Sequence, residues 1–161
     1  RLIVPMRDEI SRSMKDALKA GDKVALSTIR LIAAALKDRD ITARGNGVFE
    51  GISDDEILSM LQTMIKQRRE SSAMFRDAGR EELAEKEEKE IKIIHEFLPE
   101  QLAEDEIVTA IQTGILQTSA VSVKDMGKVM AFLKQEYAGK MDFSKISAKV
   151  KTALMNLSED G

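Results

Sequence analysis

Apolar residues recur at intervals of three or four positions through almost the whole chain of 161 residues. This interval matches the turn of an α-helix, so each run places its apolar side chains on one face. The interruptions are short and contain glycine, proline or residues that cap helices. Ala, Leu, Ile, Met, Lys and Glu dominate and favour helices, whereas only 4% of the residues are aromatic. The sequence therefore predicts an all-α protein with no β-sheet.

Seven amphipathic segments follow from these intervals. They are expected at about residues 6–20, 23–40, 54–78, 80–98, 104–118, 123–137 and 143–157. Asp22 and a capping box of Ser53 with Glu56 mark two of the starts. The cluster Arg44–Gly47 is expected to break the second helix, and Pro99 to stop the fourth. The residues assigned to inward faces include Leu18, Val24, Leu31 and Leu116.

The fourth segment is acidic, and it forms a long αα-hairpin with the third segment around Gly79. Pro99 ends this hairpin, and the next helix begins with new caps. We therefore expect two helical subdomains. Residues 1–98 form a four-helix part, and residues 99–161 form a three-helix unit.

Motifs that carry chemistry are few. The chain has no cysteine and a single histidine, His95. This excludes disulfides, thiolate nucleophiles and cysteine-ligated zinc. No motif joins His95 to a serine, and Gly45–Gly47 lacks the Lys-Ser/Thr of a phosphate-binding loop. We therefore expect no catalytic residue, no cofactor and no metal, and we expect His95 to be a partly exposed helix residue.

We expect the sequence to contain no signal that would direct the protein into a membrane or out of the cell. No apolar run approaches the roughly 18 residues of a membrane span. The segment before Met6 is too short for the apolar core of a signal peptide. Met6 is the expected natural start, with residues 1–5 foreign to the native chain, and processing that exposes Arg1 is the alternative. The prediction is a cytoplasmic protein without a membrane partner.

Charge is distributed unevenly. Residues 80–106 carry 4 basic and 11 acidic side chains, whereas residues 124–151 carry 7 and 3. Neighbouring carboxylates on a helix point in different directions, so the glutamates at 85–90 are expected to be solvated. The basic groups of the last two helices suit contacts with phosphate, which give affinity without reading sequence. The candidate nucleic-acid-binding residues are Lys124, Lys128, Lys140, Lys145 and Lys149. The alternative is that these lysines only solvate amphipathic helices.

Two stretches resemble a known family. The first is Gln67–Arg80, followed by the Glu/Lys run and Phe97–Leu102. The second is Lys124–Met130, followed by Gly139-Lys140 and a final amphipathic helix. Together they are similar to the GatB/YqeY family, and in particular to the YqeY-like proteins, small bacterial relatives of the tail of GatB. The resemblance runs from the first helix to about Leu157.

The resemblance implies that the second subdomain is a GatB-tail-like unit. GatB is the subunit of tRNA-dependent amidotransferase that activates the misacylated glutamate or aspartate on tRNA, and its tail contacts tRNA. Related domains are appended to some glutaminyl-tRNA synthetases. The implied partners are tRNA and an amidotransferase or aminoacyl-tRNA synthetase. Gly127 resembles a glycine of the GatB tail, and we expect it to allow close packing of helices.

Three functions remain open. Family naming implies carbon–nitrogen ligase activity with glutamine as amide donor, but the chain has no counterpart to the GatB catalytic domain or to an amidase subunit. This favours an accessory or tRNA-binding module that is not catalytic alone. The first alternative is a subunit that contributes to amide transfer with partner subunits. The second is an adaptor that binds proteins through the acidic hairpin.

Overall fold

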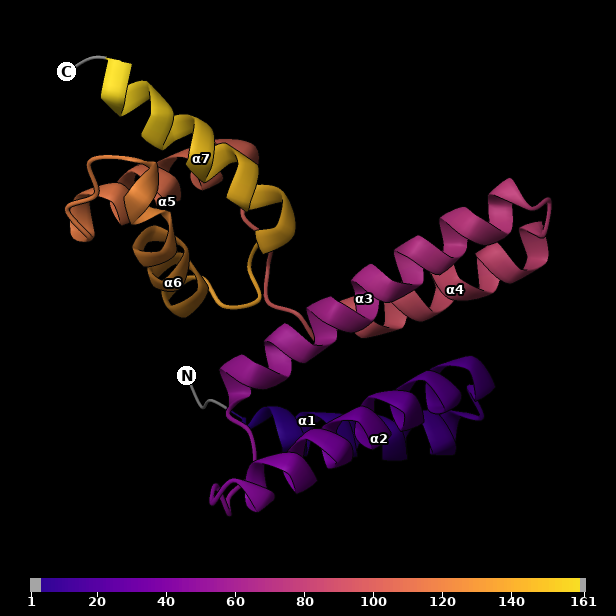
Figure 1. The fold of residues 1–161 in the computed structure, drawn as a ribbon. Coiled ribbons are helices and arrows are strands. Elements are labelled where there is room, and N and C mark those ends of the chain that lie inside the picture. Colours follow the sequence, from indigo (N-terminus) through magenta and orange to yellow (C-terminus); the bar gives the residue numbers. More distant parts are fainter. Residues whose placement is uncertain (1–3, 160–161) are drawn as a thin grey trace. The chain divides into compact units, whose positions relative to one another are not determined.

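The computed structural model describes residues 4–159 (Figure 1). In that range the regular structure consists of seven α-helices and one 3-10 turn, without a strand, so the all-α prediction is confirmed. The bounds are α1 Met6–Ala20, α2 Lys23–Gly45, α3 Asp54–Asp77, α4 Glu81–His95, α5 Glu104–Gln117, η1 Val123–Asp125, α6 Met126–Glu136 and α7 Phe143–Glu159. The expected start at Met6 concerns residues 1–5, and residues 1–3 lie outside the described range. No helix in that range is long and apolar enough to cross a membrane.

By their internal contacts, the residues form two compact units, Arg1–Leu98 and Pro99–Gly161. Each unit has its own cluster of buried apolar side chains. That these units are domains that fold separately stays a prediction. Limited proteolysis tests it: a cut between Leu98 and Glu106 should leave two stable fragments.

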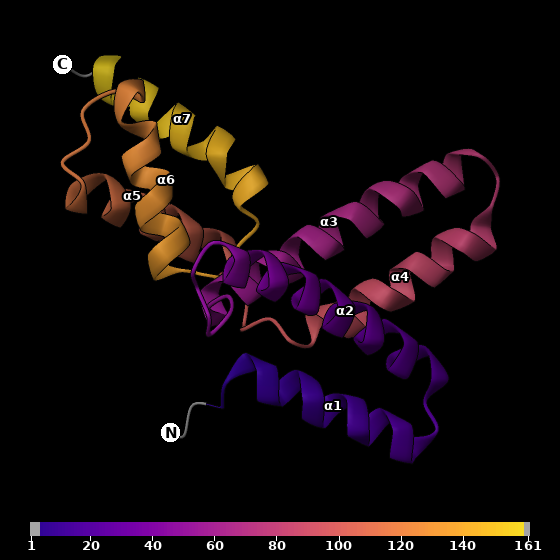
Figure 2. The same cartoon turned by 60° about the horizontal axis from the view of Figure 1, so that its bottom comes forward.

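The N-terminal unit consists of two helical hairpins. Helix α1 pairs with α2, α3 pairs with α4, and α2 also contacts α4 (Figure 2). All four helices contribute to the buried cluster, with Ile10, Ile32, Ile57, Leu61 and Ile94 among its members. Full burial of a side chain of this size contributes roughly 1.5–3 kcal/mol relative to exposure. The cluster therefore holds the two hairpins together.

Side-chain caps fix where two of these helices begin. The Asp22 carboxylate accepts a hydrogen bond from the Ala25 N–H at 3.0 Å, and the Ser53 hydroxyl accepts one from the Glu56 N–H at 3.2 Å. Both caps agree with the sequence prediction. Gly79 has a φ of 73°, a left-handed conformation that glycine adopts without steric cost. It turns the chain from α3 into α4.

Two helix boundaries differ from the prediction. Helix α2 continues through Gly45, because the Asn46 N–H still bonds to the carbonyls of Thr42 and Ala43. A glycine inside a helix lowers the stability of the helix by only about 1 kcal/mol relative to alanine, so one glycine does not have to end it. Helix α4 ends at His95, before Pro99, because the Phe97 N–H bonds to the carbonyl of Ile94 in a tighter turn.

The C-terminal unit packs α5 and α7 against α6. Its buried cluster includes Ile111, Val129, Leu133, Val150 and Leu154. Helix α7 also contacts η1, so it runs back along α6. The segment predicted as one helix at 123–137 is divided into η1 and α6.

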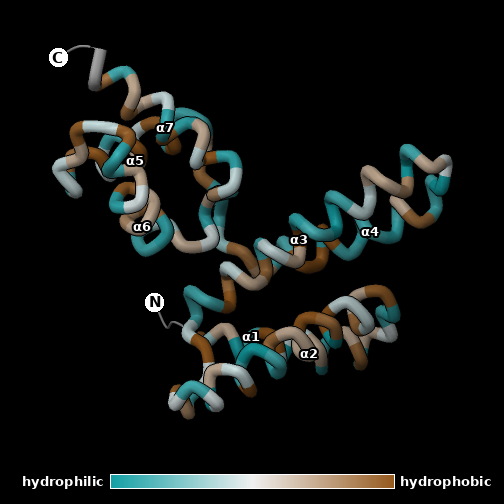
Figure 3. The backbone as a smooth tube through the Cα atoms, viewed as in Figure 1, coloured by the Kyte–Doolittle hydropathy of each residue, from teal (hydrophilic) through white to brown (hydrophobic). Residues whose placement is uncertain are grey.

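Several residues assigned to the core are exposed. Figure 3 shows apolar and polar residues alternating along the helices. The exposed fractions are 62% for Leu18, 45% for Val24, 46% for Leu31 and 79% for Leu116. Leu116 lies about 140° around the helix from the buried Ile111, so the two cannot share a face. These four assignments were wrong.

Candidate nucleic-acid interface

The five candidate lysines are all exposed, but they form two groups. Lys124 lies in η1 and Lys128 in the first turn of α6. Lys140 lies in the loop after α6, and Lys145 and Lys149 follow in the first turns of α7. Helix α6 has 11 residues and is therefore about 16 Å long, which separates the two groups. A ligand that contacts all five would have to extend along α6.

Two of the candidates face carboxylates. The Lys128 ammonium is 3.6 Å from Asp125, and the Lys149 ammonium is 3.5 Å from Glu104. Glu104 belongs to the acidic first turn of α5, which therefore lies beside Lys149. Lys124, Lys140 and Lys145 form no ion pair with a described residue. These three are the candidates with the least competition for a phosphate.

Asp125 holds a fixed negative charge in the first group. Its carboxylate accepts a hydrogen bond from the Val121 N–H at 2.9 Å and a longer one from the Ser122 N–H at 3.4 Å. The bond from Val121 keeps the pKa of Asp125 below its ordinary value. The Ser122 hydroxyl in turn accepts from the Lys124 N–H at 3.3 Å and so caps the start of η1. This cap therefore places an anion next to Lys128.

Gly127 does not pack against a neighbouring helix. A Cβ built on it would meet no atom within 4 Å, so the predicted role of Gly127 in helix packing is wrong. The glycine that does so is Gly114 of α5, where a Cβ would lie 3.3 Å from Phe132 and 3.4 Å from Val129 and Leu133. Gly127 instead leaves its backbone exposed at the start of α6.

Arg7 of α1 and Asp40 of α2 form an ion pair that was not predicted from the sequence. The Arg7 guanidinium donates to both carboxylate oxygens and also to the Ile52 carbonyl at 2.7 Å. The Ile52 N–H donates to Asp40 at 3.0 Å. One signal was available, because Asp40 continues the spacing of the buried Ile32 and Leu36. An acid at a core position indicates a buried partner.

The surroundings of this pair determine its charge state. The hydrogen bond from Arg7 lowers the pKa of Asp40 below its ordinary value, and the same bond raises the pKa of Arg7. Gly51 approaches the pair with a φ of 84°, and a Cβ there would collide with Asp40 and lie 2.8 Å from Arg7. No side chain other than hydrogen fits this position. The arrangement ties α1, α2 and the loop before α3 together.

The acidic hairpin also uses its charges internally. Arg76 of α3 binds Glu81 at 2.9 Å and Glu88 at 2.6 Å, and Arg68 binds Glu90 at 2.9 Å. The bond from Arg76 keeps the pKa values of Glu81 and Glu88 below their ordinary range. The prediction that the glutamates at 85–90 are merely solvated was wrong for Glu88 and Glu90. Their pairing leaves less free negative charge for a partner.

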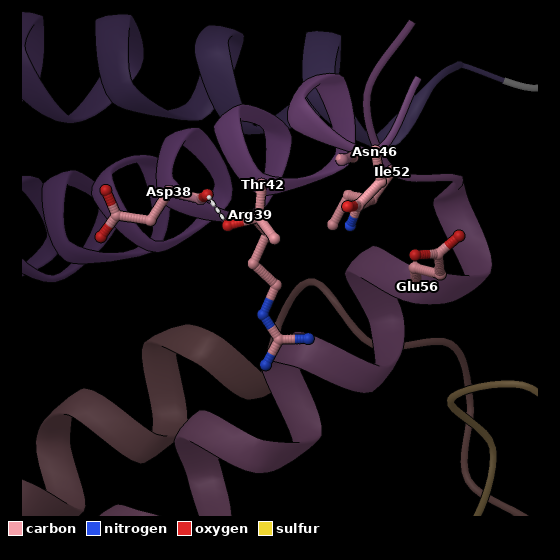
Figure 4. Close-up of a pocket in the computed structure, with 7 residues that line it drawn as sticks. Asp38, Arg39, Thr42, Asn46, Ile52 and Glu56 are labelled. Carbon is pink, nitrogen blue, oxygen red and sulfur yellow. Dashed lines mark hydrogen bonds between the residues drawn. The ribbon is translucent and has the colours of Figure 1, made fainter. Parts of the chain in front are cut away.

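A shallow depression of about 440 Å³ lies beside α2 and the start of α3 (Figure 4). Arg39 extends across it, and Glu56 lines its far side, while the Asp38 carboxylate points away from the others. The Thr42 hydroxyl donates to the Asp38 carbonyl at 3.2 Å, so it has no base to activate it. Within the described range, no three acidic or histidine side chains are grouped to hold a metal. His95 is exposed at the end of α4.

These features define a small all-helical protein with two compact helical units. The family model of YqeY-like proteins matches residues 7–154. The chain belongs to the YqeY-like protein family, as its sequence resemblance indicated.

Similar proteins come from fungi. The protein of Pyrenophora tritici-repentis called altered inheritance of mitochondria protein 41, mitochondrial, is 28% identical over 150 residues, or 87% of this chain and 80% of that protein. The Kluyveromyces lactis protein of the same name is 30% identical over 149 residues, or 89% and 73%. An uncharacterized protein of Schizosaccharomyces pombe is 30% identical over 91 residues, or 56% and 70%.

Proposed function

We propose that the chain is a tRNA-binding or accessory module that serves glutamine-dependent tRNA amidation and is not catalytic alone. Membership of the YqeY-like family carries the proposal. It is joined by the sequence resemblance to the tRNA-contacting tail of GatB. The exposed lysines of the C-terminal unit support it. Ammonium groups on an exposed helical surface attract phosphate without reading base sequence.

Lys124, Lys140 and Lys145 carry most of the expected affinity, because none of them is paired with a carboxylate in the described structure. Lys128 and Lys149 have to exchange Asp125 and Glu104 for phosphate, which reduces their net contribution. About three phosphate contacts give a slope of roughly −2 to −3 in a plot of log K against log salt. The proposed interface is therefore weak at high salt.

The test is a titration of the full chain with total tRNA at several salt concentrations. The double variant Lys140→Ala/Lys145→Glu should weaken binding to all tRNAs to a similar extent and make the slope shallower by about 1.5–2. The matched control is Lys66→Ala/Lys86→Glu, which changes the same charges on exposed residues of α3 and α4. If the first double variant binds like the parent protein at equal salt, this surface is not the interface.

Catalysis is tested separately. The purified chain with ATP, glutamine and Glu-tRNA should release no amidated product, because its described residues supply no activated nucleophile. Turnover that survives a control for contaminating amidotransferase would refute the module. Product that appears only when amidotransferase subunits are added, and more of it than those subunits form alone, would favour the subunit hypothesis.

We also propose that the chain is a cytoplasmic protein of bacterial origin. Two of the similar fungal proteins carry the word mitochondrial in their names. The titrations should therefore compare bacterial tRNA with mitochondrial tRNA. Phosphate contacts alone predict similar affinities for both pools.

A further inference from the structure

Helix α2 has a second face that is directed to solvent. Its buried residues, such as Ile29, Ile32 and Leu36, lie on one side of the helix. On the opposite side, Val24, Leu31 and Ile41 are 45%, 46% and 56% exposed. In a seven-residue frame that starts at Val24, the a and d positions of this outer face are Val24, Ser27, Leu31, Ala34, Asp38 and Ile41. This is the spacing with which one helix packs against another.

A row of basic side chains follows one edge of the outer face. Lys23, Arg30, Lys37 and Arg44 are separated by seven residues each and are all exposed. They occupy the g positions of the same frame, about 10.5 Å apart along the axis and shifted by only about 20° per step. Lys23, Arg30 and Lys37 form no ion pair with a described residue. Arg44 donates a hydrogen bond to the Phe49 carbonyl at 3.3 Å.

A second copy of the chain fits this face poorly. In an antiparallel pair of helices the g rows face each other, so basic side chains would oppose basic side chains. In a parallel pair, g residues face e residues, which here are Thr28, Ala35 and Thr42. Thr28 is fully buried, and none of the three carries a charge. Charge therefore opposes one mode of self-association and does not support the other.

RNA and lipid surfaces fit less well than a helix. A nucleic acid bound to the basic row would leave Val24, Leu31 and Ile41 in water. A bilayer would have to accept the Asp38 carboxylate in the middle of the apolar stripe, which is costly. A helix with acidic groups at its edge satisfies both the apolar stripe and the basic row.

We propose that the outer face of α2 binds an acidic amphipathic helix of another protein. The apolar residues of that helix cover Val24, Leu31 and Ile41, and its glutamates or aspartates face the basic row. A polar or basic group of the partner faces Asp38. The site lies in the N-terminal unit and does not depend on tRNA binding by the C-terminal unit.

The probe is a labelled peptide of about 21 residues, with glutamate at e and g so that either orientation presents acids. It has leucine at a and d, except for an asparagine at the position that would face Asp38. A matched peptide carries lysine in place of glutamate. Fluorescence anisotropy with the full chain at low salt should show at least about tenfold tighter binding of the acidic peptide. The variant Arg30→Glu/Lys37→Glu should reverse this preference.

Two further variants control the result. Lys66→Glu/Lys86→Glu, which changes the same charges outside the face, should bind both peptides like the parent protein. Leu31→Ser should weaken both peptides while its helical circular dichroism and melting stay like those of the parent. Equal binding of the two peptides by the parent overturns the proposal. Two other results would also overturn it. One is a concentration-dependent dimer of the chain that Leu31→Ser abolishes. The other is tRNA binding that Arg30→Glu/Lys37→Glu removes while peptide binding persists.

Discussion

The two units use different cations. All ten arginines lie in the N-terminal unit, whereas the seven basic residues of the C-terminal unit are all lysines. In the N-terminal unit, arginines of one helix bind carboxylates of another, as Arg7 binds Asp40 and Arg68 binds Glu90. In the C-terminal unit the ammonium of Lys149 lies 3.5 Å from Glu104 on an exposed surface.

The arginines of the N-terminal unit thus connect helices, whereas most lysines of the C-terminal unit remain available to bind a ligand. The planar guanidinium presents several donors in a fixed geometry, so arginine can cross-link helices, whereas lysine is a hydrated point charge on a flexible stem. The N-terminal unit uses several of its charged groups to hold its helices together. The C-terminal unit leaves most of its lysines directed to solvent, which suits contacts with phosphate but gives little rigidity.

The largest effect should come from Asp40→Ala. It leaves the Arg7 guanidinium and the Ile52 N–H without their acceptor, and we expect a loss of about 3 kcal/mol in the free energy of unfolding. Urea unfolding followed by circular dichroism measures it. Glu104→Ala is the matched control in the C-terminal unit, where a change within about 0.5 kcal/mol is expected. Equal effects of the two substitutions would remove the distinction between the units.

Lowering the pH should destabilise the folded chain, because it removes the negative charge of Asp40. Because the pKa of Asp40 is lower in the folded chain than in the unfolded chain, the unfolded state binds more protons as the pH falls. The contribution of Asp40 is thus complete above the unfolded value, about pH 4, and is lost as the pH falls through the folded value. Urea midpoints between pH 5 and pH 2.5 should fall more steeply for the parent protein than for Asp40→Asn. Parallel curves would show that Asp40 is not stabilised by its partner.

Two glycines of the C-terminal unit, Gly114 and Gly127, should respond in opposite directions to substitution by alanine. Gly114→Ala forces the side chains of Phe132 and Leu133 to move, so a loss of about 1 kcal/mol is expected. Gly127→Ala enters open space in a helix and should stabilise the unit by up to about 1 kcal/mol, because alanine favours helices. Thermal melting measures both. If Gly127→Ala stabilises the fold yet weakens tRNA binding, phosphate contacts the backbone there.

The smallest effect on stability is expected for Lys149→Ala. An exposed pair at this distance contributes about 0–0.5 kcal/mol, and salt screens it. Melting curves of variant and parent should coincide at low and at high salt. A clear loss of melting temperature that disappears at high salt would show that the Lys149–Glu104 pair stabilises the C-terminal unit. The two units would then not differ in this respect.

Local signals predicted most of the fold. Five helices begin where the sequence placed them, and in α2 and α3 a side-chain cap, Asp22 or Ser53, accepts from a backbone donor of the first turn. The failures have non-local causes. The seam of α5 continues through Gly114, which has no side chain, so the hydropathy pattern pointed to Leu116 instead. The partners of Asp40 lie 33 and 12 residues away, beyond the reach of any local pattern.

The candidate interface was harder to predict than the fold. The sequence found the exposed lysines, and the predicted helix at 123–137 already placed Lys124 and Lys128 at one end and Lys140 beyond the other, as the structure does. It did not reveal that Glu104 lies beside Lys149, since α5 and α7 meet only in the folded unit. The outer face of α2 was not predicted, because two of its apolar residues, Val24 and Leu31, were assigned to the core.

The position of Ile94 and Phe97 at the end of the N-terminal cluster has a consequence for synthesis on the ribosome. Both side chains are buried against helices that were made earlier, so the cluster stays open until this segment emerges. At about 5–20 residues per second, the 20 residues from Asp77 to Phe97 take roughly 1–4 s to add. During that time the apolar faces of α2 and α3 are in contact with water or a chaperone. A nascent chain that stalls at the hairpin turn would therefore expose its core and be prone to aggregation.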